Sequence, residues 1–429
     1  MPILCGRGIY AMRVKKYDMP MKVWIKLFLG SVIGLVLGFL LPENQRLTEA
    51  LVWLEEMALR IGRYAVIPVI VFSLTISVYE LRHDGQFWRL IIKNLLFILG
   101  MSVFVIFGGV LAALVFSPEK IPILKEEQIG VFGLDIAGSV KDLFPYNMLS
   151  VLASDGVYLF PVCVLAFFLG VGLSYDKSNI KPVISLVDSL SRIFYHIASF
   201  FVEILGFLVI VLSGYWAIRF RDILRMEVFS GLILLLAILA FAIGFVILPL
   251  FLCFIRPKAK PWKVLYGSFG PALAAFFSGD IHFSLPVLLR HTKENFGVRR
   301  RSNIVSLTLF STFCRAGSAM VAAVAFIVII KSYSLLGITF TDVMGICIRA
   351  LIISFLLARH PGDGAYIALA VLCLGYGSGY EAGYLILKPL AFYLIAVGTF
   401  LDVMIASFAS YSVARTSGFI EEKNTGHSI

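Results

Sequence analysis

The run Ser278-Gly279-Asp280-Ile281-His282-Phe283-Ser284-Leu285-Pro286 interrupts a long apolar segment of this 429-residue chain. A basic loop follows it and ends near Arg301, and the next hydrophobic span carries Arg315 near its middle. Charged residues and helix breakers are costly at membrane depth, and where they occur they usually line a site. The stretch from Phe276 to Ser318 is therefore expected to face a polar site inside the protein and not the lipid.

A second stretch has the same arrangement. The hydrophobic run before Ala358 is broken by Arg359-His360-Pro361-Gly362-Asp363-Gly364, and a later span carries Asp402 at mid-depth. Paired interrupted hydrophobic segments are the best sequence indication of the binding site of a secondary transporter. We expect two re-entrant helical hairpins, at about 262–292 and 342–380, whose tips meet at a common site.

The composition is that of a membrane protein. Hydrophobic residues make up 60% of the chain and charged residues 15%, and the mean hydropathy is +0.94. Runs of about 20 apolar residues cross a membrane as helices, whereas a transmembrane barrel would show short alternating segments. We predict an all-α polytopic membrane protein with eight transmembrane helices, at about 22–41, 48–79, 90–116, 143–174, 187–217, 228–255, 303–331 and 384–414.

Two of these spans contain local breaks. Pro68 lies inside the second span, where the missing N–H removes one backbone hydrogen bond and predicts a kink. The polar segment 117–142 is expected to form an outside loop. The fourth span is expected to consist of short pieces, because it contains Phe144-Pro145-Tyr146-Asn147 and Ser154-Asp155-Gly156.

The formal net charge of +11 does not require a nucleic-acid partner, because much of the Lys and Arg lies between the spans. Positive loops stay in the cytoplasm, which places the Arg290–Arg301 loop and both termini inside. No small-residue cleavage site follows the first span, so we expect that helix to be retained. Three basic residues are exceptions, since this topology places them outside: Arg219, Arg221 and Arg225.

Motifs for covalent or metal chemistry are absent from the sequence. It contains neither the GxxxxGK[ST] loop of ATP-driven pumps nor the HExxH pattern of zinc proteases, and its six Cys form no CxxC pair. We expect no enzyme activity and no cofactor. Sodium or a proton is the coupling ion that a carrier of this kind would use.

With these elements in order, the chain resembles the glutamate/aspartate (dicarboxylate/amino acid):cation symporter family, as a divergent bacterial-type member. The resemblance covers nearly the whole chain. It rests on the order and spacing of the following pieces: Ile67-Pro68-Val69-Ile70-Val71-Phe72-Ser73-Leu74, Phe144-Pro145-Tyr146-Asn147, Leu169-Gly170-Val171-Gly172-Leu173-Ser174, Ser284-Leu285-Pro286, Ala316-Gly317-Ser318-Ala319, Pro361-Gly362-Asp363-Gly364 and Ser412-Val413-Ala414-Arg415-Thr416.

The resemblance implies an inverted-repeat fold, a homotrimer in the inner (plasma) membrane and an elevator mechanism. A scaffold would comprise residues 1–89 (helices 1 and 2) and 117–227 (helices 4 and 5). A transport domain would comprise residues 90–116 (helix 3) and 228–416 (helices 6 to 8 and both hairpins), followed by a cytoplasmic tail at 417–429.

The chain departs from the family where the family binds sodium. The seventh helix of the family breaks at Asn-Met-Asp-Gly-Thr, which supplies sodium ligands, and here those positions read Cys314-Arg315-Ala316-Gly317-Ser318. In the eighth helix, the substrate-binding Arg of the family falls at Gly398, its sodium-binding Asp at Ala406 and its Asn at Asp402, while Thr399 is kept. Sodium needs several oxygen ligands. The standard sodium sites are therefore expected to be degraded, although a residual cation site could lie near Phe313, Cys314 and Asp402.

Several roles are open for the buried charges. Arg315 either forms a structural ion pair with Asp280 or Asp402, or its guanidinium occupies the volume of the lost sodium sites, or it binds a substrate carboxylate. An Asp that lacks such a partner in apolar surroundings would hold a proton. His282 and His360, one at each hairpin tip, are structural or titrate. Arg359 and Asp363 are water-exposed tip residues, or Arg359 reaches the ligand.

The sequence thus predicts a secondary active symporter of an amino acid or a dicarboxylate such as glutamate or aspartate. The alternatives are a proton-coupled or sodium-independent exchanger of another small amino acid or carboxylate, and an anion channel on the same fold. The expected partners are the small-molecule substrate, membrane lipid and two further copies of the chain. The predicted substrate-binding residues are Asp280, His282, Ser284, Arg315, Gly317, Ser318, Arg359, Pro361, Gly362, Asp363, Gly364, Thr399 and Asp402.

Overall fold

The computed structural model describes residues 23–42, 44–116, 138, 141–153, 157–175, 180–255, 260–333, 338–377 and 379–421. Over these ranges the regular elements are all helices. They are α1 (Val23–Leu40), α2 (Gln45–Arg63), α3 (Val66–His83), α4 (Phe87–Val115), η1 (Met148–Ala153), α6 (Phe160–Gly172), α7 (Lys181–Leu224), η2 (Glu227–Phe229), α8 (Ser230–Phe241), the π-helix η3 (Ala242–Ile247), α9 (Leu248–Ile255), α10 (Pro261–Ser278), α11 (Ile281–Glu294), α12 (Arg300–Phe313), α13 (Ala316–Tyr333), α14 (Phe340–Leu356), η4 (Leu357–Arg359), α15 (Gly364–Tyr376), α16 (Gly383–Ile386) and α17 (Ala391–Thr416).

Eight helical segments of the described chain are long and apolar enough to cross a membrane. The predicted all-α polytopic class is confirmed, although the eight helical segments are not the same eight that the sequence predicts. The predicted span 143–174 is not among them, because its described part consists of the short η1 and α6. The segment Phe340–Arg359, which the sequence places in the second hairpin, is among them.

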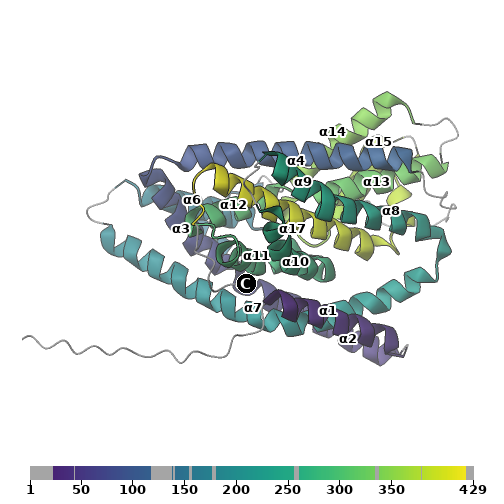
Figure 1. Cartoon of the computed structure of the whole chain (residues 1–429), viewed down its shortest axis with the longest axis horizontal. Helices are drawn as coiled ribbons and strands as arrows, with labels where there is room; N and C mark the ends of the chain where they lie inside the picture. Colours follow the sequence, from purple (N-terminus) through teal and green to yellow (C-terminus); the bar gives the residue numbers. More distant parts are fainter. Residues whose placement is uncertain are drawn as a thin grey trace, which may run out of the picture.

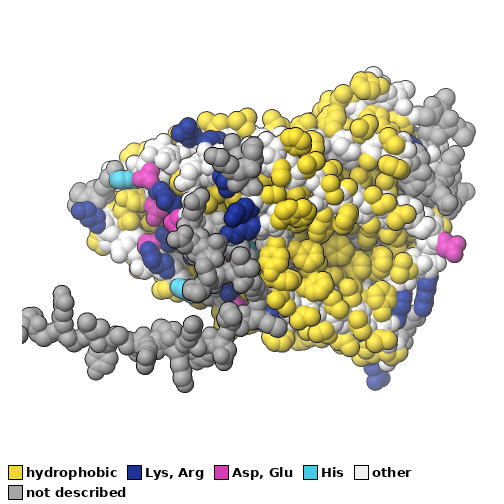
Figure 2. Space-filling model, viewed as in Figure 1, with side chains coloured by type: hydrophobic (Ala, Val, Ile, Leu, Met, Phe, Trp, Pro, Cys, Tyr) yellow, Lys and Arg dark blue, Asp and Glu magenta, His cyan; other side chains and the backbone are white. Residues whose placement is uncertain are grey.

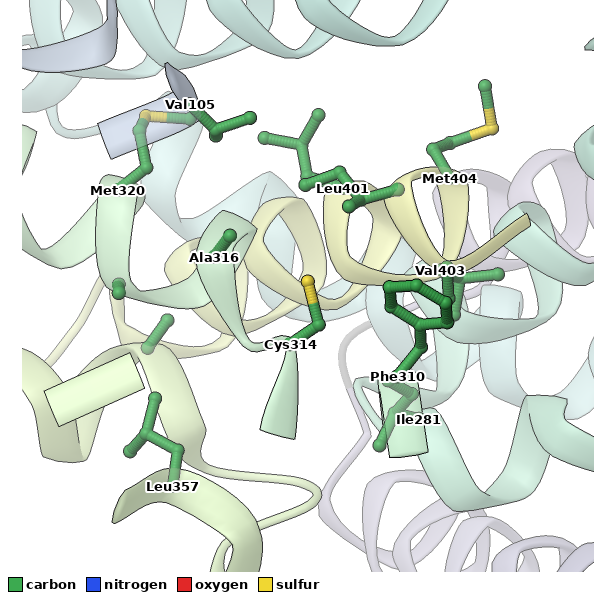
Figure 3. Packing of buried hydrophobic residues seen from close by; sticks show 14 of the residues in the cluster. Val105, Ile281, Phe310, Cys314, Ala316, Met320, Leu357, Leu401, Val403 and Met404 are labelled. Carbon is green, nitrogen blue, oxygen red and sulfur yellow. The ribbon is translucent and has the colours of Figure 1, made fainter. Parts of the chain in front are cut away.

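The long helices α4 and α7 run along opposite sides of the molecule, and α10, α11, α12, α13 and α17 lie between them (Figure 1). In their most apolar 18 residues, the α12–α13 segment is 94% buried and α17 is 83% buried, whereas α1 is 33% buried. Figure 3 shows the packing at this centre, where Phe310, Met320 and Leu401 come from α12, α13 and α17. The elements that carry the predicted site residues therefore form the interior of the fold.

Helices α1 and α7 approach each other more closely than ordinary side chains allow. A Cβ built on Gly30 would lie 2.4 Å from the carbonyl oxygen of Gly206, and one on Gly34 2.2 Å from that of Ile210. Gly38 makes the same approach to Gly214 at 2.4 Å. Glycines four residues apart let two membrane helices bring their backbones into contact. The pair α1–α7 is thus a tightly packed and apolar part of the fold.

The predicted breaks occur, with one shift in position. The second span is interrupted at Tyr64 and Ala65, between α2 and α3, and Pro68 lies in the first turn of α3, where its missing N–H costs no helical bond. The first hairpin breaks at Gly279, whose φ of +64° ends α10 in the left-handed conformation that glycine adopts without strain. The predicted break Ser154-Asp155-Gly156, most of the loop 117–142 and most of the tail 417–429 lie outside the described residues.

Charge is distributed unevenly over the surface. Figure 2 shows hydrophobic side chains over the broad middle of the molecule, and Lys, Arg, Asp and Glu gathered toward the end where α3 meets α4. Large apolar side chains such as Trp88, Phe200 and Phe241 are more than 60% exposed. Exposed apolar surface of this extent is typical of a protein that is surrounded by lipid.

Candidate functional site

The polar centre of the molecule lies where α12 ends at Phe313 and α13 begins at Ala316. The first backbone N–H groups of a helix have no partner within the helix and need an acceptor. Asp402 of α17 is that acceptor. Its Oδ1 accepts from the N–H groups of Gly317 at 2.7 Å and Ser318 at 3.2 Å, and its Oδ2 accepts from the Ser318 hydroxyl at 2.6 Å. The carboxylate of α17 therefore caps α13, at the helix end that favours a negative charge.

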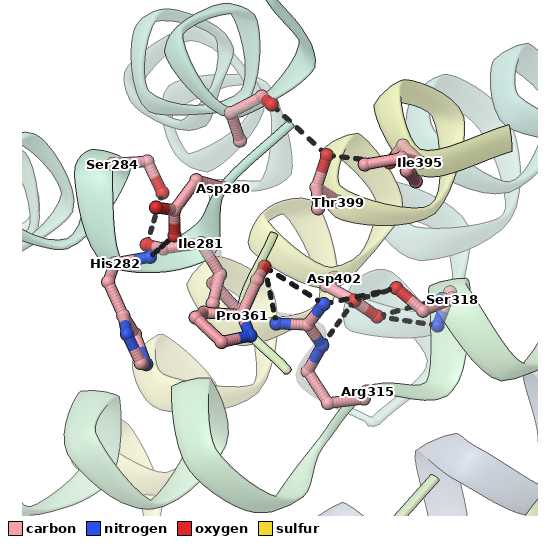
Figure 4. A network of polar contacts seen from close by, with 12 residues as sticks. Asp280, Ile281, His282, Ser284, Arg315, Ser318, Pro361, Ile395, Thr399 and Asp402 are labelled. Carbon is pink, nitrogen blue, oxygen red and sulfur yellow. Dashed lines mark hydrogen bonds and ion pairs between the residues drawn. The ribbon is translucent and has the colours of Figure 1, made fainter. Parts of the chain in front are cut away.

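Arg315 lies in the break between α12 and α13, and its guanidinium points at the same carboxylate (Figure 4). Its Nε is 3.0 Å from Asp402 Oδ2, and the two side chains are 1% and 0% exposed. Its Nη1 and Nη2 each donate to the carbonyl oxygen of Pro361 at 3.2 Å. One side chain thus links the helix break, α17 and the tip of the second hairpin.

Gly364 leaves the room that this guanidinium needs. A Cβ at that position would lie 2.6 Å from Arg315 Nη2, which is closer than the two atoms can approach. Its φ is not among the positive values of the described glycines, so the backbone itself does not require glycine here. Gly364 is among the residues predicted to bind substrate, and in the structure the group that approaches it is the side chain of Arg315.

The tip of the first hairpin is built around Asp280. Its carboxylate caps α11 by accepting from the N–H of His282 at 2.7 Å, and it forms an ion pair with Arg63 at the end of α2. The N–H of Ile281 donates to the carbonyl oxygen of Pro361 at 3.4 Å. The two hairpin tips therefore touch each other at the carbonyl that also accepts from Arg315.

A cleft of about 400 Å³ lies in front of the two tips, between them and helices α2 and α7. We call it the tip cleft. Cavities of this size hold small organic molecules. Its charged lining contains three arginines and three carboxylates, and its apolar wall is aromatic; these residues are Arg63, Arg219, Arg359, Glu55, Asp280, Asp363, Trp216, Phe276, Phe277 and Phe392.

The three arginines of the tip cleft are held in different ways. Arg63 pairs with Asp280, and Arg359 pairs with Asp142 at 2.6 Å. The guanidinium carbon of Arg219 lies 5.1 Å from the centre of the Phe392 ring and 5.7 Å from that of Tyr215. Its charge also acts on Glu55, which lines the same cleft, but no ion pair joins them in the described residues. A guanidinium held over aromatic rings can still direct its N–H donors at a carboxylate. Arg219 is therefore the arginine of this cleft best placed to bind an anionic group of a ligand.

The other predicted residues occupy three kinds of place. Thr399 donates to the carbonyl oxygen of Ala275 at 3.0 Å and joins α17 to α10, and Ser284 donates to that of Ile281 at 2.8 Å. Both hydroxyl groups thus donate hydrogen bonds to backbone carbonyl oxygens of the first hairpin. The His282 side chain is buried at the start of α11. The tip cleft, in contrast, is lined by several predicted residues of the second hairpin: Arg359, His360, Pro361, Gly362 and Asp363.

The residual cation site near Phe313, Cys314 and Asp402 stays a prediction. A carboxylate offers about four acceptor positions. Four groups contact that of Asp402: two backbone N–H groups, the Ser318 hydroxyl and Arg315. Within the described residues, no group of three or more His, Cys, Asp or Glu could hold a metal ion. The carboxylate that would anchor such a cation is already occupied by protein donors.

Sequence reasoning missed Arg63 and Arg219 as residues of the site. Arg63 lies inside the predicted second span, five residues before Pro68, so its depth in an apolar run was a signal of the same kind as that of Arg315. Arg219 entered the sequence analysis as an exception to the topology rule. A basic residue on the wrong side of the membrane is itself a signal of function, because orientation does not account for it.

With this geometry established, comparison with known proteins identifies the family. The family model described as the Sodium:dicarboxylate symporter family matches residues 23–416, which is most of the chain. The chain belongs to this family. Its members are transporters and not enzymes, so the chain is assigned to a family of multi-pass membrane carriers of small molecules.

Named relatives are distant. The chain is 24% identical over 206 residues to the "Proton/sodium-glutamate symport protein" of Bacillus subtilis, covering 46% of this chain and 48% of the relative, about half of its length. It is 23% identical over 382 residues to the human "Neutral amino acid transporter B(0)", covering 80% of this chain and 68% of the relative. A third relative, the "Proton/sodium-glutamate symport protein" of Geobacillus stearothermophilus, is 20% identical over 359 residues, with 81% and 83% covered.

Proposed function

We propose that this member of the Sodium:dicarboxylate symporter family is a secondary active transporter of an amino acid, and that Arg315 takes the place of the coupling sodium ion. Relatives are named as glutamate symporters and as neutral amino acid transporters, which supports an amino acid as the substrate class. The substitution of a fixed cation for a bound one rests on the surroundings of Arg315.

The observation that carries the proposal is that Asp402 and the Pro361 carbonyl oxygen already accept hydrogen bonds from protein groups. Asp402 is contacted by four protein groups, and the Pro361 oxygen accepts from the guanidinium and from the N–H of Ile281. A sodium ion needs oxygen atoms that are open to it. It would also be repelled by the positive charge of Arg315 at short range in a buried site. The guanidinium supplies the positive charge that links α13, α17 and the second hairpin.

The tip cleft supports a zwitterionic substrate. Its lining has equal numbers of arginines and carboxylates, so a ligand with one ammonium and one carboxylate group leaves the charges balanced. Arg219 would bind the α-carboxylate, and Asp363, which is exposed to the cleft, would bind the α-ammonium. The aromatic wall suits an apolar side chain. A dicarboxylate such as glutamate would need a further cation that is not already paired with a carboxylate.

The proposed motion is that of an elevator within a homotrimer, as the family resemblance implies. A small cluster of buried apolar residues, separate from the main core, joins α1, α2 and α7 to the first hairpin, with Phe283 and Val287 on the hairpin side. The pair Arg63–Asp280 crosses the same boundary. Further ion pairs join α3 and α7 to α11 and α12, namely Arg290–Glu203, Arg300–Asp188 and Arg301–Asp84. Sliding of one group of helices against the other would keep the apolar contacts and would require these ion pairs to exchange partners.

Proton coupling is the second candidate for the driving force. His360 lines the tip cleft next to Asp363, and a histidine can change its charge by binding a proton. Burial lowers the pKa of His360 below its usual value, so this proton would be taken up on the acidic side of neutrality. A protonated His360 would add one positive charge to the cleft and would favour an anionic substrate. In this candidate a proton gradient would drive uptake, whereas the first candidate requires no sodium gradient.

Uptake by purified protein in liposomes tests the proposal. Labelled alanine, leucine, glutamate and aspartate are offered in sodium or choline buffer, with and without an inward pH gradient. We expect saturable uptake or counterflow of a neutral amino acid that is the same in sodium and in choline. Uptake abolished in choline would overturn the role of Arg315, and a current of anions without saturable counterflow would favour a channel.

A further inference from the structure

A second cleft, separate from the transport site, lies toward the charged end of the molecule. Its volume is about 320 Å³, and it is formed by α7, by the end of α11 and by the start of α12. We call it the basic cleft. Its lining is Ser191, Arg192, Tyr195, His196, Lys293 and Arg300. The lining thus contains three permanent cations and no carboxylate.

The carboxylates behind the basic cleft neutralise only part of this charge. Arg300 donates to Asp188 at 2.5 Å and lies 3.5 Å from Glu80. Arg192 shares Asp188 at 3.0 Å, and its side chain is 69% exposed. Lys293 places its Nζ 3.9 Å from the centre of the Tyr195 ring. Glu294, next to Lys293, is paired with Arg290. The exposed guanidinium of Arg192 lies at the rim of the cleft.

An apolar strip continues from the basic cleft along α7. At 3.6 residues per turn, the side chains of Arg192 and His196 are followed around the helix by those of Phe200, Ile193 and Ile197. These three apolar side chains are 64%, 52% and 37% exposed. A basic cleft that adjoins an exposed apolar strip matches the two parts of a phospholipid, a charged head group and an acyl chain.

We propose that the basic cleft binds the phosphate head group of an anionic phospholipid, with an acyl chain along Ile193, Ile197 and Phe200. Arginine binds phosphate through paired N–H donors, and basic pockets between membrane helices suit anionic head groups. The apolar strip favours a lipid over free phosphate, because free phosphate has no apolar group to pack against it. The lipid would bridge α7 to the α11–α12 connection, on the two sides of the boundary described above.

The test uses the purified full-length chain in a neutral detergent and follows its thermal unfolding. Short-chain dioctanoyl phosphatidylglycerol is titrated, and dioctanoyl phosphatidylcholine and inorganic phosphate are titrated separately. A ligand that binds only the folded state raises the unfolding temperature in a saturable manner. We expect this rise with phosphatidylglycerol, and no comparable rise with the other two at equal concentration.

Paired variants locate the effect. Arg192→Gln with Lys293→Gln removes two cleft cations while leaving the Arg300–Asp188 pair, and is expected to weaken phosphatidylglycerol binding by about tenfold or more. Arg89→Gln with Lys181→Gln removes two exposed cations elsewhere and is the matched control, expected to bind as the unaltered chain does. Arg192→Lys with Lys293→Arg keeps the charges and should retain most of the binding.

Three results would overturn the proposal. One is an equal response of the unaltered chain to phosphatidylcholine, which would mean that the head-group charge is not recognised. Another is an equal response to inorganic phosphate, which would identify a site for the free anion. The third is a cleft double variant that binds phosphatidylglycerol as tightly as its control. Uptake activity enters none of these measurements, so the proposal stands or falls independently of the transported substrate.

Discussion

Two ion pairs with the same chemistry, Arg315–Asp402 and Arg63–Asp280, lie close to the hairpin tips and differ in what they connect. The first joins α17 to the break between α12 and α13, and both of its side chains are at most 1% exposed. The second joins α2 to the first hairpin; its Asp280 is 1% exposed, but Arg63 is 23% exposed and both residues line the tip cleft. An enclosed pair is costly to break, whereas a pair that water can reach is exchanged at lower cost. The comparison suggests a fixed cation in the interior and a releasable link at the boundary.

The largest effect is expected from breaking the enclosed pair. Arg315→Met alone or Asp402→Asn alone leaves one buried charge without its partner, which destabilises a protein by about 3–5 kcal/mol. Thermal unfolding of the purified variants measures this loss. The double variant Arg315→Met with Asp402→Asn introduces the uncharged residues that the family resemblance implies for these positions, and it should be more stable than either single variant. Equal losses that simply add in the double variant would contradict a coupled pair.

Gly364→Ala probes the same pair without changing any charge. The added Cβ would displace the Arg315 guanidinium from the Pro361 carbonyl, and overpacking of this kind costs about 1–3 kcal/mol. Gly362→Ala is the matched control in the same motif, because its Cβ would meet its nearest atom, Arg63 Nη2, at an ordinary 3.7 Å. Unfolding temperatures that fall equally in both variants would show that the tip and not Arg315 is responsible.

The sequence predicts features that depend on neighbouring residues better than contacts between residues far apart in the chain. The breaks at Gly279 and at Pro361-Gly362 were predictable, because glycine, proline and charge inside an apolar run have local consequences. The partner of Arg315 was not, since Asp280 and Asp402 are equally charged and equally deep in the sequence. Only the fold shows that Asp280 faces Arg63. The α1–α7 glycine contact was also missed, although Gly30, Gly34 and Gly38 recur every four residues.

Arg63→Gln tests whether the boundary pair is releasable. Asp280 keeps its hydrogen bond from the N–H of His282, and water can reach the vacated place, so we expect a stability loss of about 1.5 kcal/mol. If the pair must break during the transport cycle, counterflow of substrate in liposomes should become faster at unchanged substrate affinity. A lower unfolding temperature with no change in counterflow would assign the pair a purely structural role.

The smallest effect is expected from Arg301–Asp84, an Arg–Asp ion pair at the surface, at the turn between α3 and α4. Partial burial raises the pKa of Asp84, but the hydrogen bond and charge of Arg301, together with His83, lower it by more, so the pKa lies below its usual value. A lowered pKa in the folded state gives a stabilisation that is present above the unfolded pKa and is lost as the pH falls through the folded one. Because both groups reach solvent, the contribution is at most about 1 kcal/mol. Asp84→Asn should therefore flatten the acid side of the stability profile slightly and leave the unfolding temperature at low pH unchanged, whereas a loss comparable to that of Asp402→Asn would show that burial does not separate these pairs.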